Sequence, residues 1–159
     1  MGILAQFELR RHEWRNITCG CGKSADHLLG WLESGIGENG IALRALDGHA
    51  FIESNLQPPA PAVTAVAMAA LSEAQSTEYR KQLLWLLLSL AAGEEDGDSV
   101  ESSIYWKCHE LIRDGLWLIY GEVVKAEGAV IGQYALEIAE IVEWDEARLG
   151  MYRGTGKGF

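Results

Sequence analysis

The sequence predicts an all-α fold of about seven helices. Apolar residues recur at three- and four-residue steps, no segment alternates apolar and polar residues as a half-buried strand does, and short polar or glycine-containing loops separate the helix-sized segments. We expect antiparallel helix pairs, arranged as an α-solenoid or a compact helical domain. The 159 residues fit one domain, with N-terminal helices in 1–57, helical pairs in 58–150 and a flexible tail in 151–159.

The N-terminal third carries the weaker helix signals. Ser24 is the expected N-cap of a helix over 25–34, which Gly35 ends. A further helix is expected from about 38 to 48, and a turn follows over 49–55. We expect little or no sheet in this region.

Proline marks the start of the clearer part of the chain. Prolines occur only at positions 58, 59 and 61, and because proline is tolerated in the first turn of a helix, they indicate a helix that continues to Leu71. Ser76 and Thr77 precede a helix over 78–92 that is apolar on nearly every side, as a helix in the middle of a helical domain is. Gly93 ends it.

Two further helical segments follow a polar loop. A long helix begins near Ser103, and we expect Gly115 to kink or split it. The last helix covers 127–142, where apolar residues recur at four-residue steps. These segments complete the predicted all-α domain.

Charge and composition restrict the class of function. The chain has 13 Lys and Arg against 23 Asp and Glu, a net charge of -10, and 48% hydrophobic residues, as a globular core requires. The acidic excess argues against nucleic-acid or anionic-membrane binding. No apolar run approaches the roughly 20 residues that span a bilayer, and the N-terminus lacks the features of a secretory signal, so we expect a cytoplasmic protein.

The net charge is concentrated in two acidic segments of the C-terminal half. The first, 94–101, has five acids, and the second, 127–146, has six; neither segment contains a base. A solvated face that aids solubility and a surface that steers a basic protein partner both fit this pattern. Trp117 and Trp144 adjoin a helix break and acidic residues, so either ring is a candidate exposed contact. The candidate partner-binding residues are Glu94, Glu95, Asp96, Asp98, Glu101, Trp117, Glu137, Glu140, Glu143, Trp144, Asp145 and Glu146.

Cysteine and histidine cluster near the N-terminus. Cys19 and Cys21, with His12 and His27 nearby, offer the sulfur and imidazole ligands of a zinc site. Paired Cys-x-x-Cys spacing is the strong indicator of such a site, and Cys-x-Cys is not, so a turn with small, partly buried thiols is the favoured interpretation. We expect no metal and no cofactor, while metal binding by the two cysteines stays open.

Catalytic motifs are weak throughout the chain. Cys108 and His109 are adjacent on a predicted helix and point in different directions, and Cys108 lies on the apolar stripe of the core. The glycine spacing over 35–40 matches a dinucleotide-binding fingerprint but follows a helix rather than a strand. We therefore expect no enzymatic activity.

Four segments carry a resemblance to a known protein family: 14–22 leading into the helix over 25–32, then 58–71, 83–93 and 108–115. Together they resemble a bacterial family of small HEAT-like immunity proteins, which are encoded beside polymorphic or secreted toxins and neutralise them by binding. The resemblance implies a toxin-binding protein without catalytic residues, whose specificity lies in its surface residues.

The resemblance and the charge pattern agree on a stoichiometric inhibitor. We expect an immunity protein whose acidic C-terminal surface occludes the basic active site of a cognate toxin. A nuclease is the expected toxin because nucleases carry Lys and Arg to meet phosphates. The alternative is a helical adaptor or scaffold subunit of a cytoplasmic complex, and a third is a metal-dependent enzyme using Cys19, Cys21 and a histidine.

Overall fold

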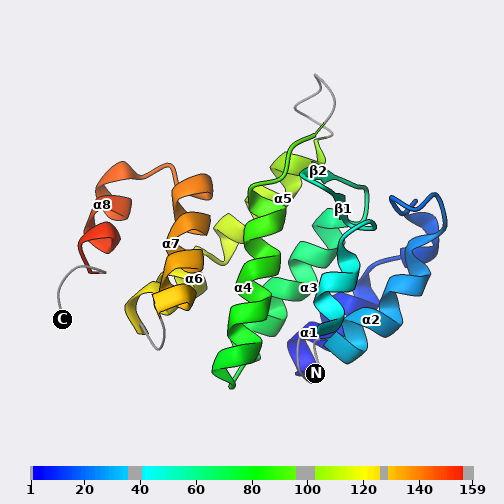
Figure 1. Cartoon of the computed structure of the whole chain (residues 1–159), viewed down its shortest axis with the longest axis horizontal. Coiled ribbons are helices and arrows are strands. Elements are labelled where there is room, and N and C mark those ends of the chain that lie inside the picture. Colours follow the sequence, from blue (N-terminus) through cyan, green and yellow to red (C-terminus); the bar gives the residue numbers. More distant parts are fainter. Residues whose placement is uncertain (1, 36–40, 96–102, 126–128, 156–159) are drawn as a thin grey trace.

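Helices form most of the described chain, which confirms the predicted all-α class. The computed structural model describes residues 2–35, 41–95, 103–125 and 129–155 (Figure 1). Within these ranges the only sheet is a hairpin of two-residue strands. In chain order the elements are α1 (Ile3–Arg11), η1 (Trp14–Asn16), η2 (Ala25–His27), α2 (Leu28–Gly35), η3 (Ile41–Leu46), β1 (Phe51–Ile52), β2 (Asn55–Leu56), α3 (Ala60–Glu73), α4 (Thr77–Ala91), α5 (Ile104–Asp114), α6 (Leu116–Lys125), α7 (Ala129–Val142) and α8 (Glu146–Thr155), with η marking 3₁₀ helices.

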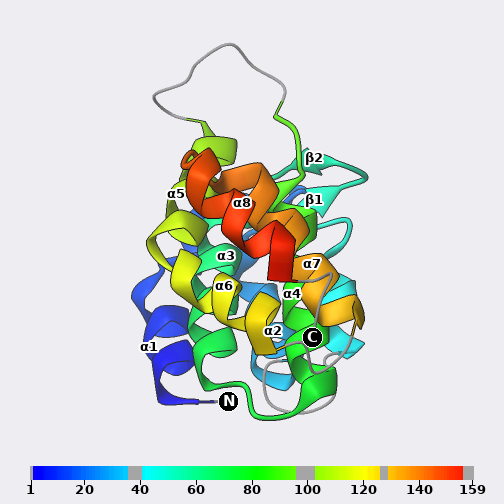
Figure 2. The same cartoon turned by 90° about the vertical axis from the view of Figure 1, so that its left-hand side faces the viewer.

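The helices α3 and α4 form the centre of the molecule. The helix α3 packs against α1, α4 and α5, and α4 also packs against α7. Figure 1 shows α2 at one end of the long axis, with α1 beside α3, and α6, α7 and α8 at the other end, which faces the viewer in Figure 2. No helix in the described ranges is both long enough and apolar enough to cross a bilayer. The apolar circumference of α4 is buried at Leu83, Leu84, Leu86, Leu87 and Leu90.

The central helices begin and end close to the predicted residues. Ser76 is the N-cap of α4, since its hydroxyl accepts a hydrogen bond from the Tyr79 N–H at 3.1 Å. Ser103 caps α5 in the same way, and Pro59 is the N-cap residue of α3. Gly115 separates α5 from α6, so the predicted long helix is split there.

Near the N-terminus the helices are shorter than predicted, and part of the predicted helical segments is 3₁₀ helix. The expected helix over 25–34 is the 3₁₀ turn η2 followed by α2. Ser24 is the N-cap residue, as predicted, but its hydroxyl donates to the Arg15 carbonyl at 3.2 Å and accepts no capping hydrogen bond. The helix expected over 38–48 is the 3₁₀ helix η3, while 36–40 lies outside the described residues.

A β-hairpin occupies the segment where a turn was expected, over 49–55. Phe51 pairs with Leu56 and Ile52 with Asn55. The Leu56 N–H also donates to the Glu94 carbonyl at 2.8 Å, which places the hairpin against the chain that leaves α4. Gly93 permits this close approach, because a Cβ there would overlap the Leu56 side chain.

Two helices were not predicted, one at each end of the chain. One of them is α1. The carboxylate of Glu73 in the last turn of α3 accepts hydrogen bonds from the Leu4 and Ala5 N–H groups, which have no acceptor within the first turn of α1. The helix α8 continues to Thr155, past the point where we expected a flexible tail to begin, and 156–159 lies outside the described residues.

Candidate functional site

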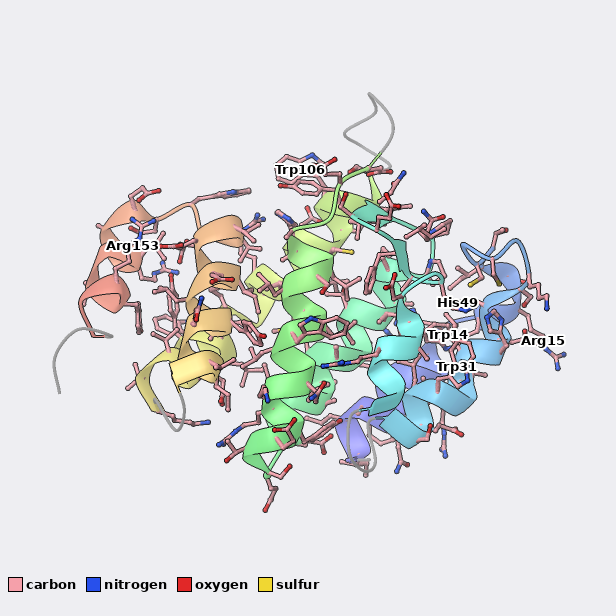
Figure 3. The ribbon with its side chains drawn as sticks, viewed as in Figure 1. Trp14, Arg15, Trp31, His49, Trp106 and Arg153 are labelled. Atoms are coloured by element: carbon pink, nitrogen blue, oxygen red, sulfur yellow. The ribbon has the colours of Figure 1, made fainter. Side chains whose placement is uncertain are left out.

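The second acidic segment forms a corner between α7 and α8, where arginines of α8 partly neutralise it. We call the segment from Glu137 to Glu146, together with Arg148 and Arg153 of α8, the acidic corner. Arg148 and Arg153 follow the segment directly in the sequence, and Figure 3 shows Arg153 reaching back toward α7. The surface therefore keeps fewer unpaired negative charges than the sequence predicts. The ion pairs are Arg148–Glu143 at 3.1 Å, Arg148–Asp145 at 3.4 Å, Arg153–Glu140 at 2.8 Å and Arg153–Glu146 at 3.5 Å.

Glu143 is buried at the centre of this corner. Its side chain is 5% exposed, and its carboxylate accepts hydrogen bonds from the Tyr120 hydroxyl at 2.8 Å and from the Trp144 and Asp145 N–H groups, each at 2.9 Å. Burial opposes the charged form, but these donors and Arg148 outweigh it, so the pKa of Glu143 lies below its ordinary value. Glu143 thus holds the corner together.

Two exposed tryptophans, both named as candidates in the sequence analysis, lie beside the corner. Trp117 and Trp144 are each 69% exposed. The Arg113 guanidinium lies 3.6 Å from the centre of the Trp144 ring, and that of Arg148 lies 5.5 Å from the Trp117 ring. Arg113 is itself held by a hydrogen bond from its Nε to the Val142 carbonyl at 3.0 Å. We call Trp117, Trp144, Arg113 and Arg148 the tryptophan patch.

The first acidic segment is described only at its start. Glu94 is exposed, and its backbone holds the hairpin. Glu95 caps α5: its carboxylate accepts hydrogen bonds from the Ser103 hydroxyl at 2.5 Å and the Tyr105 N–H at 3.1 Å. Burial acts against this charge, but the donors prevail and lower the pKa of Glu95. Asp96, Asp98 and Glu101 lie outside the described residues.

The described parts of the two acidic segments lie at opposite ends of α5. Glu95 caps the first turn of this helix, whereas Arg113 in its last turn bonds the Val142 carbonyl next to Glu143. The 11 residues of α5 span about 16 Å. The structure therefore brings Glu143 and Asp145, through Arg148, together with the tryptophans, and leaves Glu94 and Glu95 apart from them. Glu127 lies outside the described residues.

A cluster of cysteine and histidine side chains lies at the other end of the molecule. The Sγ atoms of Cys19 and Cys21 and one ring nitrogen each of His27 and His49 all lie within 4.8 Å of one another. The sequence pointed to the first three residues, but not to His49, which lies in the turn before β1. Figure 3 shows His49 beside Trp31, far from Arg153.

The other predicted sulfur and imidazole groups lie outside this cluster. His12 packs against Trp14, with ring centres 5.8 Å apart, and approaches Glu8 at 3.7 Å. Cys108 is fully buried in the core, as predicted, and burial raises its pKa to about 12. His109 is bound through Nε2 to the Ala91 carbonyl at 2.8 Å. These groups serve packing and helix contacts.

Glycines shape the loop that carries the two cysteines. The Cys19 N–H donates to the Lys23 carbonyl at 2.7 Å, and Gly22 adopts a φ of +79°, a left-handed conformation that glycine adopts freely. The Gly20 N–H donates to the His49 carbonyl at 3.1 Å, which brings the distant histidine to the loop. A Cβ at Gly20 would lie only 3.0 Å from that carbonyl oxygen.

Comparison of the chain with protein-family models, with curated proteins and with solved structures gives no match.

Proposed function

We propose that this protein is an immunity protein that binds and neutralises a cognate bacterial toxin through the tryptophan patch and the acidic corner. The observation that carries the proposal is the pair of exposed tryptophan rings, each beside an arginine. Tryptophan and arginine are the residues most enriched at the energetic centres of protein interfaces. Because Arg113 and Glu143 anchor the patch, binding orders few additional side chains.

The partner is expected to be a basic protein. The chain carries a net charge of -10, and Glu140, Asp145 and Glu146 expose carboxylates next to the patch. Opposite charges on two proteins speed their encounter and disfavour wrong partners. A nuclease toxin fits because its phosphate-binding surface is rich in Lys and Arg, and an inhibitor seated there would block the substrate path.

The first experiment identifies the partner. Tagged protein is captured from its native host, whatever co-purifies in near-equal amount is identified, and co-expression is tested for rescue of cells from that partner. A single basic and toxic partner supports the proposal. A non-toxic subunit of a complex would contradict it and support the alternative, a helical adaptor or scaffold.

The second experiment tests the surface. We expect the double variant Trp117→Ala, Trp144→Ala to lose at least roughly ten-fold in affinity for the toxin, because truncating a central interface residue costs about 2 kcal/mol or more. Titration calorimetry measures the loss. The matched control is Phe7→Ala, which removes an aromatic ring that is 58% exposed on α1, outside the tryptophan patch. Equal affinities for both variants would contradict this surface.

A further inference from the structure

The Cys/His cluster points to a function separate from partner binding. We propose that Cys19, Cys21, His27 and His49 bind one structural Zn²⁺ ion, with two sulfur and two nitrogen ligands. Two Cys and two His ligands are one of the standard sets of structural zinc sites. The spacing, with one residue between the cysteines, five before His27 and 21 before His49, differs from that of common zinc motifs.

Four of the six distances between the ligand atoms are close to the edges of a zinc tetrahedron, and all six are within 4.8 Å. At bond lengths of about 2.3 Å to sulfur and about 2.0 Å to nitrogen, tetrahedral ligands lie about 3.3 Å apart for two nitrogens and about 3.5 Å apart for nitrogen and sulfur. The two ring nitrogens, His27 Nε2 and His49 Nδ1, are 3.1 Å apart. The Sγ of Cys19 is 3.2 Å from His49 Nδ1 and 3.7 Å from His27 Nε2, and the Sγ of Cys21 is 3.8 Å from His27 Nε2.

A carbonyl group orients one of the imidazole ligands. The Nδ1 of His27 lies 2.6 Å from the Ser24 carbonyl oxygen, which can only accept a hydrogen bond, so Nδ1 carries the proton. The lone pair of Nε2 then points into the cluster. Ligating histidines commonly donate their second ring nitrogen to a carbonyl or carboxylate, which fixes the ring and strengthens the ligand.

Aromatic packing shields one side of the cluster. The Trp31 ring meets His27 and His49 edge to face, with ring centres 5.5 Å and 4.8 Å apart. Cys19 is buried, whereas Cys21 is exposed and gives the ion a route of entry. The four ligands leave no coordination position for a substrate, which favours a structural ion over the metal-dependent enzyme considered above.

The ion would stabilise the part of the chain that has the least regular structure. Between α1 and α3 the described backbone forms mainly 3₁₀ turns, the short helix α2 and two-residue strands. Ligands at both ends of the segment 19–49 would close it into one loop around the metal. Because the ligands gather only in the folded state, the free energy of metal binding would add to folding stability.

The test uses the full chain, freed of any affinity tag and reduced beforehand. We expect about one zinc per chain by elemental analysis, and intense visible absorption of tetrahedral Co²⁺ when cobalt replaces zinc. Cys21→Ala should lose at least roughly ten-fold in zinc affinity, measured by competition with a coloured chelator. Cys21 is exposed, so this variant should still fold, which circular dichroism verifies.

The matched control is the same substitution at a thiol outside the cluster. Cys108→Ala should retain the zinc content and the cobalt spectrum of the parent protein, because Cys108 lies in the core within α5. Zinc well below one per chain, a cobalt spectrum of the hydrated ion, or equal zinc affinity in Cys21→Ala would each overturn the proposal. None of these outcomes bears on the tryptophan patch, so the two proposals fail independently.

Discussion

Glu143 shows how an acidic residue can stabilise the molecule rather than meet a partner. Its carboxylate accepts hydrogen bonds from two backbone N–H groups, from the Tyr120 hydroxyl and from Arg148. Reversing its charge would break this network, so binding tests should leave Glu143 intact. From the sequence it could not be distinguished from Glu140, which is exposed.

We expect Glu143→Gln to lower the free energy of unfolding at pH 7 by about 1–3 kcal/mol, because the buried donors lose a charged acceptor. The folded pKa of Glu143 is depressed, so its contribution is present above the unfolded pKa of about 4.3 and is lost as pH falls through the folded pKa. Urea unfolding at pH 7, and at a pH below the folded pKa of Glu143, measures the difference in the free energy of unfolding between the variant and the parent protein. This difference should be smaller at the lower pH. Glu33→Gln, at an exposed site on α2, is the control, and an unchanged difference at both pH values would contradict the prediction.

The candidate site residues differ in how far the sequence predicted them. The sequence marked Trp117 and Trp144 as candidates for exposure because each adjoins a helix break or charged neighbours, but burial of most tryptophans was the general expectation. Nothing local marked His49 as a partner of Cys19, since 29 residues separate them and a backbone hydrogen bond from Gly20 brings them together. The arginines that pair with the acidic corner lie in α8, where no helix was predicted.

At the scale of elements, the central helices were predicted because their apolar pattern matches their burial. The helix α1 gives a weaker pattern: Ala5 and Leu9 are buried, but Ile3, Leu4 and Phe7 are exposed. Its start depends on Glu73, 69 residues from Leu4. Contacts made only in the folded chain thus decide its position.

A buried ion pair joins α4 to α6, between Arg80 and Glu122 at 3.5 Å, with both side chains almost fully buried. We expect Glu122→Gln to lower the free energy of unfolding by about 3 kcal/mol, because it removes a buried carboxylate charge with which both Arg80 and Lys125 pair. Denaturant titration measures the effect. Glu78→Gln, in the exposed pair with Lys81 on α4, should have a much smaller effect, because solvent screens an exposed ion pair.

A double variant separates the charge from the packing. Replacing both members of the pair, as Arg80→Met with Glu122→Met, should cost less than Glu122→Gln alone, because no buried charge is left unpaired. A larger loss in the double variant would show that the pair stabilises the fold directly.

At the scale of the whole molecule, the acidic charge should govern the rate of toxin binding. We expect the association rate constant to fall roughly ten-fold or more as salt rises from about 0.05 to about 0.5 M, with little change in dissociation. Stopped-flow mixing measures both rates. A rate independent of salt would remove the electrostatic part of the proposed function.

Two charge-reversal variants with the same change in net charge locate the effect. Glu140→Lys with Glu146→Lys alters the acidic corner, while Glu33→Lys with Glu53→Lys alters exposed positions outside it. The first pair should weaken the salt dependence more than the second. If both variants change the salt dependence of association equally, the total charge of the protein, and not the acidic corner, speeds the association.

The helix α8 is attached to the core mainly through Leu149, its one fully buried residue among those described, and through stacking of Tyr152 on Tyr120. Most of its other positions are exposed, so substitutions there cost little stability. The exposed side chains of α8 can therefore change without unfolding the protein. Under the proposed function, relatives that bind different toxins should differ in sequence along this helix.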